Sequence, residues 1–196
     1  IFVHIPKTGG NSVSRALLPF TESRLEEAES PAGFGSGENF WTVDPVFGRD
    51  KHFTADHYAS LMDTREYTFF ATVRNPWDLM VSLYYFRKQT GTGNWQTHAP
   101  ETFNKAEFRQ FLRAGEPTQV SYLGGKSVRL MRFERLEQDF AALSQRLGLG
   151  ALTLDKINAS RRQRYQDVLD DDLAAEIGTL YAEDVRRFGY SFAGNG

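Results

Sequence analysis

The segment 67–73, YTFFATV, constrains the fold of this chain more than any other stretch. It is rich in β-branched and aromatic residues and almost continuously apolar, as is typical of a central strand in a parallel sheet. A helix start follows at once, with Asn75 as the expected N-cap and Pro76 in the first helical position. A buried strand that runs directly into a helix is the repeating unit of an α/β protein. We therefore expect a parallel sheet whose strands are connected through helices.

The remainder of the chain continues this alternation. Further strands are predicted at 1–5 and 127–133, and residues 20–50 and 89–100 are expected to be loops. Further helices are predicted at 11–18, with Asn or Ser as cap, at 56–62, at 104–115, at 134–148 and, as one long helix, at 170–190. A length of 196 residues with 40% hydrophobic residues suits a single domain spanning 1–196.

The charge balance and the absence of cysteine exclude several classes of protein. With 23 basic and 25 acidic residues, the chain lacks the basic surplus of an electrostatic nucleic-acid binder. Without cysteine there is no disulfide, no Cys-ligated zinc and no thiol catalysis, and a cytoplasmic location is favoured. No apolar run approaches the roughly 20 residues of a membrane helix, so no membrane segment is expected here. Because the chain begins at Ile1, an upstream anchor stays open.

The segment PKTGGNS follows the first predicted strand and leads into a helix. Such a turn presents backbone N–H groups to an anion, and Lys7 adds a positive charge. Lys7 precedes the glycines, whereas the lysine of an ATP-binding Walker loop follows them. A simple turn with a solvated lysine explains this segment, taken alone, about as well. The candidate anion ligands are Lys7, Thr8, Gly9, Gly10, Asn11 and Ser12.

A second candidate site follows the strand at 67–73. Arg74 emerges at the carboxyl end of that strand, where ligands of parallel sheets bind, and Ser82 lies about two turns into the next helix. A guanidinium and a hydroxyl at this spacing could hold a second phosphate. The alternative is an Arg74 that pairs with Asp78 and a Ser82 on a solvated helix face. Two such elements together indicate a ligand with separated anionic groups.

The segments PKTGGNS and VRNPWDLMVSLYYF resemble the 5′-phosphosulfate loop and the 3′-phosphate element of sulfotransferases that use 3′-phosphoadenosine-5′-phosphosulfate. The likeness runs from residue 2 to about 190. It implies the three-layer, P-loop-like sulfotransferase fold with a central parallel sheet, this donor, its product 3′,5′-adenosine bisphosphate and no required metal. The stretch HIPKTGG is closer to carbohydrate-directed members, which implies an acceptor hydroxyl on a glycan or glycoside. The loops at 20–50 and 89–104 are expected to choose the acceptor.

The resemblance also implies catalytic roles. Lys7 would stabilise the leaving phosphate, and His52 would act as general base, with His57 as the second choice. Lys51 is adjacent to His52 and is expected to point the other way, which leaves a second catalytic lysine in doubt. A further cofactor loop is expected around Arg161 and Arg162, with Arg164 as the alternative, or else these arginines are only a solvated basic run.

Two other classes of function remain open from the sequence. A P-loop kinase or NTPase would depend on Mg²⁺ and would bind ATP without regard to a 3′-phosphate. A non-catalytic nucleotide- or glycan-binding relative would keep the fold without turnover.

Overall fold

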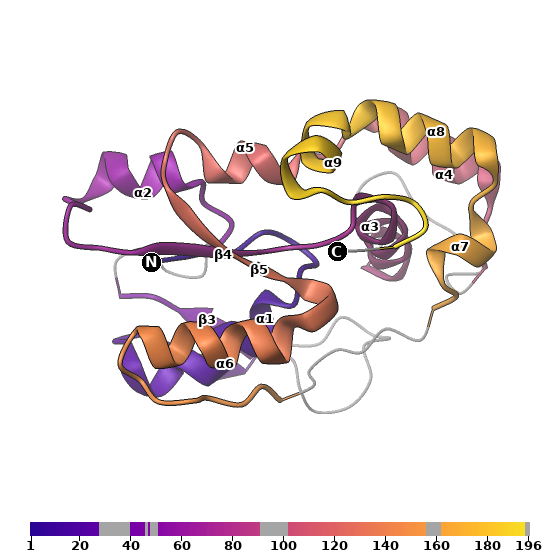
Figure 1. Cartoon of the computed structure of the whole chain (residues 1–196). Coiled ribbons are helices and arrows are strands. Elements are labelled where there is room, and N and C mark those ends of the chain that lie inside the picture. Colours follow the sequence, from indigo (N-terminus) through magenta and orange to yellow (C-terminus); the bar gives the residue numbers. More distant parts are fainter. Residues whose placement is uncertain (28–39, 46, 48–50, 91–101, 156–161, 195–196) are drawn as a thin grey trace. The chain divides into compact units, whose positions relative to one another are not determined.

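The computed structural model describes residues 1–27, 40–45, 47, 51–90, 102–155 and 162–194 (Figure 1). The chain is an α/β protein with a three-stranded parallel sheet. It divides into two compact units, each described here by itself. Unit 1 comprises Ile1–Ser30, Gly35–Val73 and Ser121–Ala159, and unit 2 comprises Pro31–Phe34, Arg74–Val120 and Ser160–Gly196.

The parallel sheet belongs to unit 1. Its strands β1 (Phe2–Val3), β4 (Phe69–Val73) and β5 (Val128–Arg132) lie in the order β1-β4-β5. Every residue of β4 is buried, which confirms the central strand predicted from its apolar sequence. In the register of the sheet, Phe70 pairs with Phe2 of β1 and with Arg129 of β5. The carboxyl ends of β1 and β4, where the two predicted motifs start, therefore lie at the same edge.

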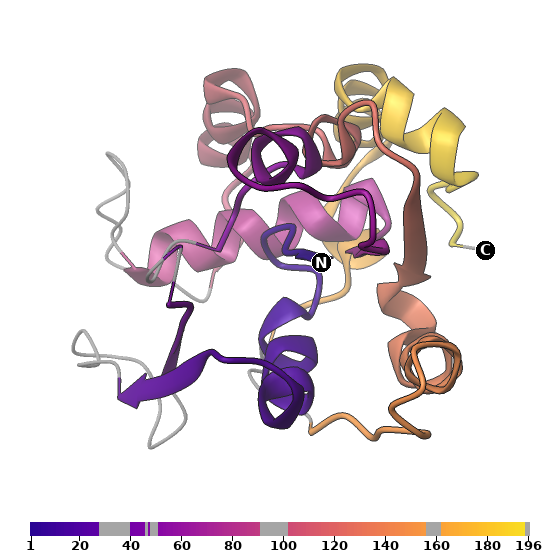
Figure 2. The same ribbon diagram turned by 90° about the vertical axis from the view of Figure 1, so that its left-hand side faces the viewer.

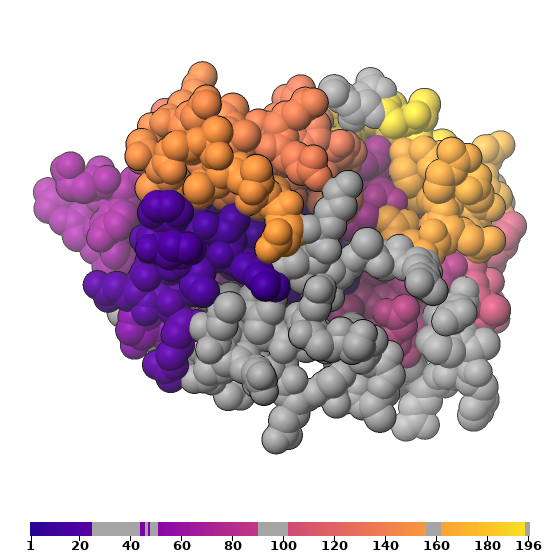
Figure 3. Space-filling model, turned by 90° about the horizontal axis from the view of Figure 1, so that it is seen from below, coloured from indigo at the N-terminus to yellow at the C-terminus, as the bar shows by residue number. Residues whose placement is uncertain are grey.

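Two helices of unit 1 cover one face of this sheet. They are α1 (Gly10–Leu17), followed by the 3₁₀ turn η1 (Leu18–Phe20), and α6 (Leu136–Arg146), preceded by η2 (Phe133–Arg135). A third helix, α2 (Ala55–Leu61), lies on the opposite face (Figures 1 and 2). The outer surfaces of α1 and α6 adjoin in Figure 3. The core beneath them is formed by Val13, Leu17, Phe70, Met131, Leu136, Phe140 and Leu143.

The segment 20–50, expected to be a loop, contributes regular structure to unit 1. Strands β2 (Arg24–Glu27) and β3 (Phe40–Val43) pair antiparallel, separately from the main sheet. A short helix that was not predicted, α5 (Gln119–Leu123), begins in unit 2 and continues in unit 1.

Unit 2 is helical in the part that the structure describes. It contains α3 (Pro76–Thr90), α4 (Lys105–Ala114), α7 (Tyr165–Val168), α8 (Asp171–Leu180) and α9 (Ala182–Phe188). Asn75 caps α3 as predicted, because its Oδ1 accepts from the N–H of Trp77 at 3.1 Å. The indole N–H of Trp77 donates to the Ala174 carbonyl at 2.8 Å and so fastens α3 to α8. The single helix expected at 170–190 is divided at Tyr181 into α8 and α9.

Within the described ranges, no helix combines the length and the apolar character needed to cross a membrane.

Candidate functional site

The first group of candidate residues lies in unit 1, where β1 leads into α1. Helix α1 begins at Gly10, and its N-cap is Gly9, in the left-handed conformation with φ of 84°. The predicted Asn or Ser cap is therefore wrong, because Asn11 and Ser12 lie within the first turn. The amide of Ser12 donates to the Gly9 carbonyl at 3.1 Å, and none of the described residues supplies an acceptor for the amides of Gly10 and Asn11. This helix start can therefore offer two backbone donors to an anion.

The loop before α1 holds a strained conformation. Among the described residues, Lys7 is the sole non-glycine with positive φ, at 61°. This region costs a residue with a Cβ atom roughly 1–2 kcal/mol, and such strain gathers at functional sites. Thr8 is fully buried, and its hydroxyl donates to the Ile5 carbonyl at 2.9 Å. The Thr8 side chain thus braces the loop from inside.

Both glycines of the loop are required by close packing. A Cβ atom on Gly9 would lie 2.7 Å from Cδ2 of Leu136, and the positive φ of Gly9 independently disfavours any other residue. A Cβ atom on Gly10 would overlap the imidazole of His4. His4 is buried, and it stacks on Phe2 with 5.5 Å between ring centroids. The start of α1 therefore rests directly on the end of β1.

His52 contacts the same end of β1 through His4. Its Nδ1 lies 2.8 Å from the backbone carbonyl oxygen of His4, and its ring meets the His4 ring edge-on at 4.8 Å. A carbonyl oxygen only accepts hydrogen bonds, so Nδ1 carries the proton. The neutral imidazole then has its lone pair on Nε2. The structure thus orients His52 in the tautomer that a general base at Nε2 needs.

Lys51 also reaches this loop, although sequence reasoning expected it to point away. Its ammonium donates to the Asn11 side-chain oxygen at 2.9 Å, and burial lowers its pKa. Asn11 thus accepts from a lysine instead of capping the helix. The only feature of the sequence that pointed to a role for Lys51 in this loop was its position beside the candidate base, His52. The second-choice base, His57, is exposed on α2, where it stacks on Phe53 at 4.5 Å.

The second group of candidate residues lies in unit 2, at the start of α3. Arg74 is 6% exposed and donates from Nε to Oδ2 of Asp78 at 2.7 Å. It also donates from Nη1 to the hydroxyl of Ser82 at 3.4 Å. The ion pair with Asp78, considered as the alternative to a phosphate site, is therefore present. Arg74 nevertheless lies beside Ser82 as well.

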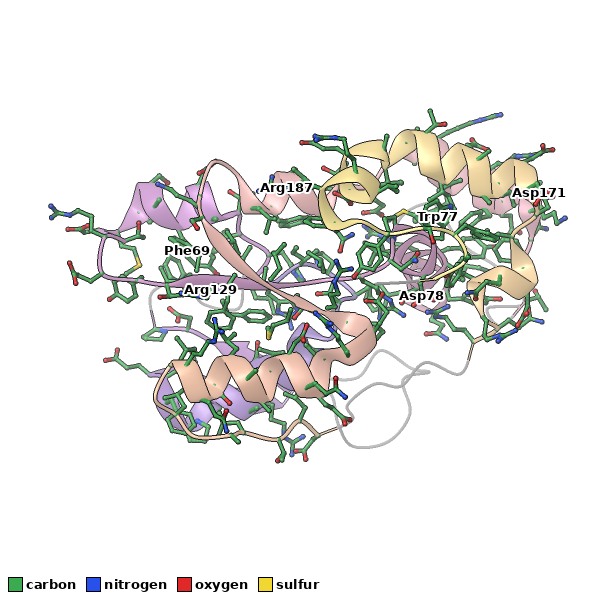
Figure 4. The ribbon with its side chains drawn as sticks, in the orientation of Figure 1. Phe69, Trp77, Asp78, Arg129, Asp171 and Arg187 are labelled. Atoms are coloured by element: carbon green, nitrogen blue, oxygen red, sulfur yellow. The ribbon has the colours of Figure 1, made fainter. Side chains whose placement is uncertain are left out.

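Arg162 joins this group through the same carboxylate. Its Nη2 lies 2.5 Å from Oδ1 of Asp78, whose place on α3 is labelled in Figure 4. Burial acts to raise the pKa of Asp78, but Arg74 and Arg162 outweigh it and hold that pKa below its usual 3.8. Two guanidinium groups therefore bind the same carboxylate. Arg164 is bound elsewhere, to Asp167 at 3.0 Å, and Arg161 lies outside the described residues.

Gln119 is a buried member of this group that sequence reasoning missed. Its side-chain oxygen accepts from the Arg74 N–H at 2.7 Å, and its side-chain nitrogen donates to the Arg74 carbonyl at 2.8 Å. Asp184 of α9 in turn accepts from the backbone N–H groups of Gln119 and Val120 at 2.8 and 2.9 Å. A lone glutamine in a polar stretch gives no sequence signal for such a role.

The structure therefore forms one candidate group in each unit, around the start of α1 and around the start of α3. No cluster of His, Cys, Asp and Glu that could hold a metal occurs among the described residues. Comparisons with family models, with curated proteins and with solved structures find no match to this chain. The residues themselves therefore carry the functional assignment.

Proposed function

We propose that this chain is a sulfotransferase that moves a sulfonate group from 3′-phosphoadenosine-5′-phosphosulfate to an acceptor hydroxyl, on a glycan or glycoside. The proposal includes the three-layer, P-loop-like fold in a single domain. The observation that carries it is the bond from His52 Nδ1 to the His4 carbonyl. This bond holds the proposed base against His4, the residue that follows β1 and leads into the candidate anion loop.

The chemistry follows from the residues of the first group. His52 takes the proton of the acceptor hydroxyl at Nε2 as the acceptor oxygen forms its bond to sulfur. The bond between sulfur and the bridging oxygen of the 5′-phosphate breaks, and that oxygen keeps the electron pair. Lys7 and the amides of Gly10 and Asn11 stabilise the negative charge that collects there. The products are a sulfate ester and 3′,5′-adenosine bisphosphate.

Lys51 adds a second cation to this group. Its bond to the Asn11 side chain places the ammonium at the first turn of α1, next to the amides that would face the leaving phosphate. Its lowered pKa reflects a desolvated position, where a positive charge acts more strongly on a nearby anion than in water. We assign Lys51 to the same electrostatic task as Lys7.

The residues of the second group suit the other anion of the donor, its 3′-phosphate. Arg74 and Arg162 offer two guanidinium groups that share the Asp78 carboxylate, and Ser82 offers a hydroxyl. A kinase or NTPase would instead bind the β- and γ-phosphates through a lysine placed after the glycines, and this chain lacks that order.

Calorimetric titration tests the donor. The wild-type protein is titrated with 3′,5′-adenosine bisphosphate, adenosine 5′-monophosphate, ADP and ATP, each with and without Mg²⁺. We expect the bisphosphate to bind most tightly, without need of metal. The Arg74→Ala variant should lose this preference for the 3′-phosphate, whereas Arg164→Ala, which removes an exposed arginine, should keep it. A preference for Mg-ATP would replace the proposal with the kinase reading.

Turnover distinguishes the enzyme from a binding relative. Release of 3′,5′-adenosine bisphosphate from the sulfonate donor is followed in the presence of a panel of glycans and glycosides. Transfer to any member of the panel supports the enzyme. Tight binding of the bisphosphate without transfer to any hydroxyl, sugar or otherwise, favours the non-catalytic relative.

A further inference from the structure

Two buried polar atoms of unit 2 have no hydrogen-bond partner within the described part of the chain. They are the phenolic oxygen of Tyr85 and Nε of Arg162. Tyr85 is 4% exposed, and the Arg162 side chain is 9% exposed. Burying a donor without an acceptor is unfavourable, so each such atom in a folded protein calls for an explanation.

Tyr85 lies on the same face of α3 as the candidate anion ligands. Asp78, Ser82 and Tyr85 are spaced by four and then three residues, and side chains at this spacing follow one stripe of a helix. Burial raises the pKa of the Tyr85 phenol, and the nearby charge of Arg162 acts in the opposite direction. Arg162 itself is held against this stripe by its bond to Asp78.

The unused donors therefore belong to the group that already contains Arg74 and Ser82. The Tyr85 hydroxyl and Arg162 Nε are both hydrogen-bond donors. Among the side chains of this group, only Asp78 carries a negative charge. An oxygen of a bound phosphate is the acceptor that such an arrangement lacks. Phenylalanine at position 85 would fill the same space without the unfavourable hydroxyl, so the hydroxyl itself calls for a ligand.

We propose that the Tyr85 hydroxyl and Arg162 Nε are two further donors to the anion bound by Arg74 and Ser82, and that both bind phosphate oxygens. The identity of that anion as the 3′-phosphate of the sulfonate donor rests on the function proposed above.

The test compares Tyr85→Phe with Tyr84→Phe. The Tyr84 hydroxyl is the structural contrast, because it donates to Glu107 at 3.0 Å and accepts from the N–H of Asn104 at 3.3 Å. For each variant we measure the melting temperature without ligand and the Kd for 3′,5′-adenosine bisphosphate and for adenosine 5′-monophosphate.

We expect Tyr85→Phe to weaken binding of the bisphosphate about tenfold or more, since a bond to a charged group is lost. Binding of the monophosphate and the melting temperature should not fall. Tyr84→Phe should lower the melting temperature and leave the ratio of the two Kd values unchanged. A Tyr85→Phe variant that melts lower with an unchanged ratio would show a structural hydroxyl and overturn the inference.

A separate measurement applies if the wild-type protein does not bind the bisphosphate, which would remove the proposed donor. The shift of the melting temperature by inorganic phosphate and by sulfate is then compared between the wild type and Tyr85→Phe. Stabilisation that depends on Tyr85 supports the anion site without the sulfonate donor. Equal stabilisation of the two proteins, or none, overturns the inference.

Discussion

The side-chain amide of Gln119 pairs with both backbone polar groups of Arg74, at 2.7 Å to its N–H and 2.8 Å to its carbonyl. Arg74 directly follows the last residue of β4, so the amide acts there as a neighbouring strand would. Gln119 is fully buried, and Asp184 fixes its position in turn. The backbone that aims the Arg74 guanidinium is thus held from a helix far away in the sequence.

Replacing Gln119 should destabilise the protein and disturb the site together. Gln119→Leu keeps the volume but leaves the N–H and carbonyl of Arg74 buried without partners, which costs about 2–4 kcal/mol in the free energy of unfolding. Urea unfolding measures this loss. Gln138→Leu, at an exposed position of α6, is the control and should change little. If both variants unfold at the same urea concentration as the wild type, the pairing with Arg74 has no energetic weight.

Gly10 should tolerate no side chain. Gly10→Ala places a methyl group in the His4 ring, so either α1 or the ring must move, and we expect a lower melting temperature together with weaker anion binding. Gly125→Ala is the matched control, because a Cβ atom there meets nothing within 4 Å and its φ is not positive. Thermal melts and bisphosphate titration of the two variants side by side check this. Equal behaviour of both would contradict the close contact of Gly10 with His4.

His52 should matter for turnover and little for binding. We expect His52→Ala to lower the rate of sulfonate transfer by about 10²–10⁴-fold, the usual contribution of a general base. Its Kd for 3′,5′-adenosine bisphosphate should stay within about twofold of the wild type, because the proposed mechanism assigns the imidazole to the acceptor hydroxyl and not to the bisphosphate. His57→Ala serves as the control on the neighbouring helix. Loss of activity in His57→Ala with full activity in His52→Ala would reverse the assignment.

The stability of the protein should fall in mild acid because of His4. Burial, and then the charges of His52 and Lys51, hold the pKa of His4 well below its usual 6.5. Below pH 6.5, His4 therefore binds a proton in the unfolded chain but stays neutral in the folded chain. Stability is full above pH 6.5 and falls below it, by up to roughly 1.4 kcal/mol per pH unit for one proton.

Urea unfolding at several pH values between 7 and 5 measures this slope. His4→Phe lacks the ionisable group and can still stack on Phe2, so its stability should depend less on pH over the same range. A His4→Phe curve as steep as that of the wild type would place the titration on another residue.

The sequence predicted the elements whose signals are local. The apolar run of β4 and the Asn75–Pro76 helix start are both present, because burial on both faces and capping depend on the residues themselves. The order of strand, loop and helix around Lys7 likewise followed from the sequence. The pairing of Arg74 with Asp78 was foreseen as an alternative because the two are four residues apart on a helix.

The missed features depend on residues distant in sequence. Nothing near Gln119 indicates that its partner is Arg74, which lies 45 residues away. Lys51 reaches Asn11 across 40 residues, so no local pattern could have shown that Asn11 would not cap α1. The break at Tyr181 was hidden because the residues on both sides favour helix, whereas the structure separates them into α8 and α9.

The positive φ of Lys7 lowers the stability of the folded protein, whereas the lysine side chain at the same position supplies a cation for the proposed chemistry. Glycine or asparagine would adopt that backbone with less strain, so laboratory evolution for thermal tolerance alone would drift toward them. Each such replacement would relieve the backbone strain of the loop and would also remove the positive charge of Lys7. A stability-guided redesign that replaces residue 7 would therefore remove one of the two lysines, Lys7 and Lys51, that we propose stabilise the leaving phosphate.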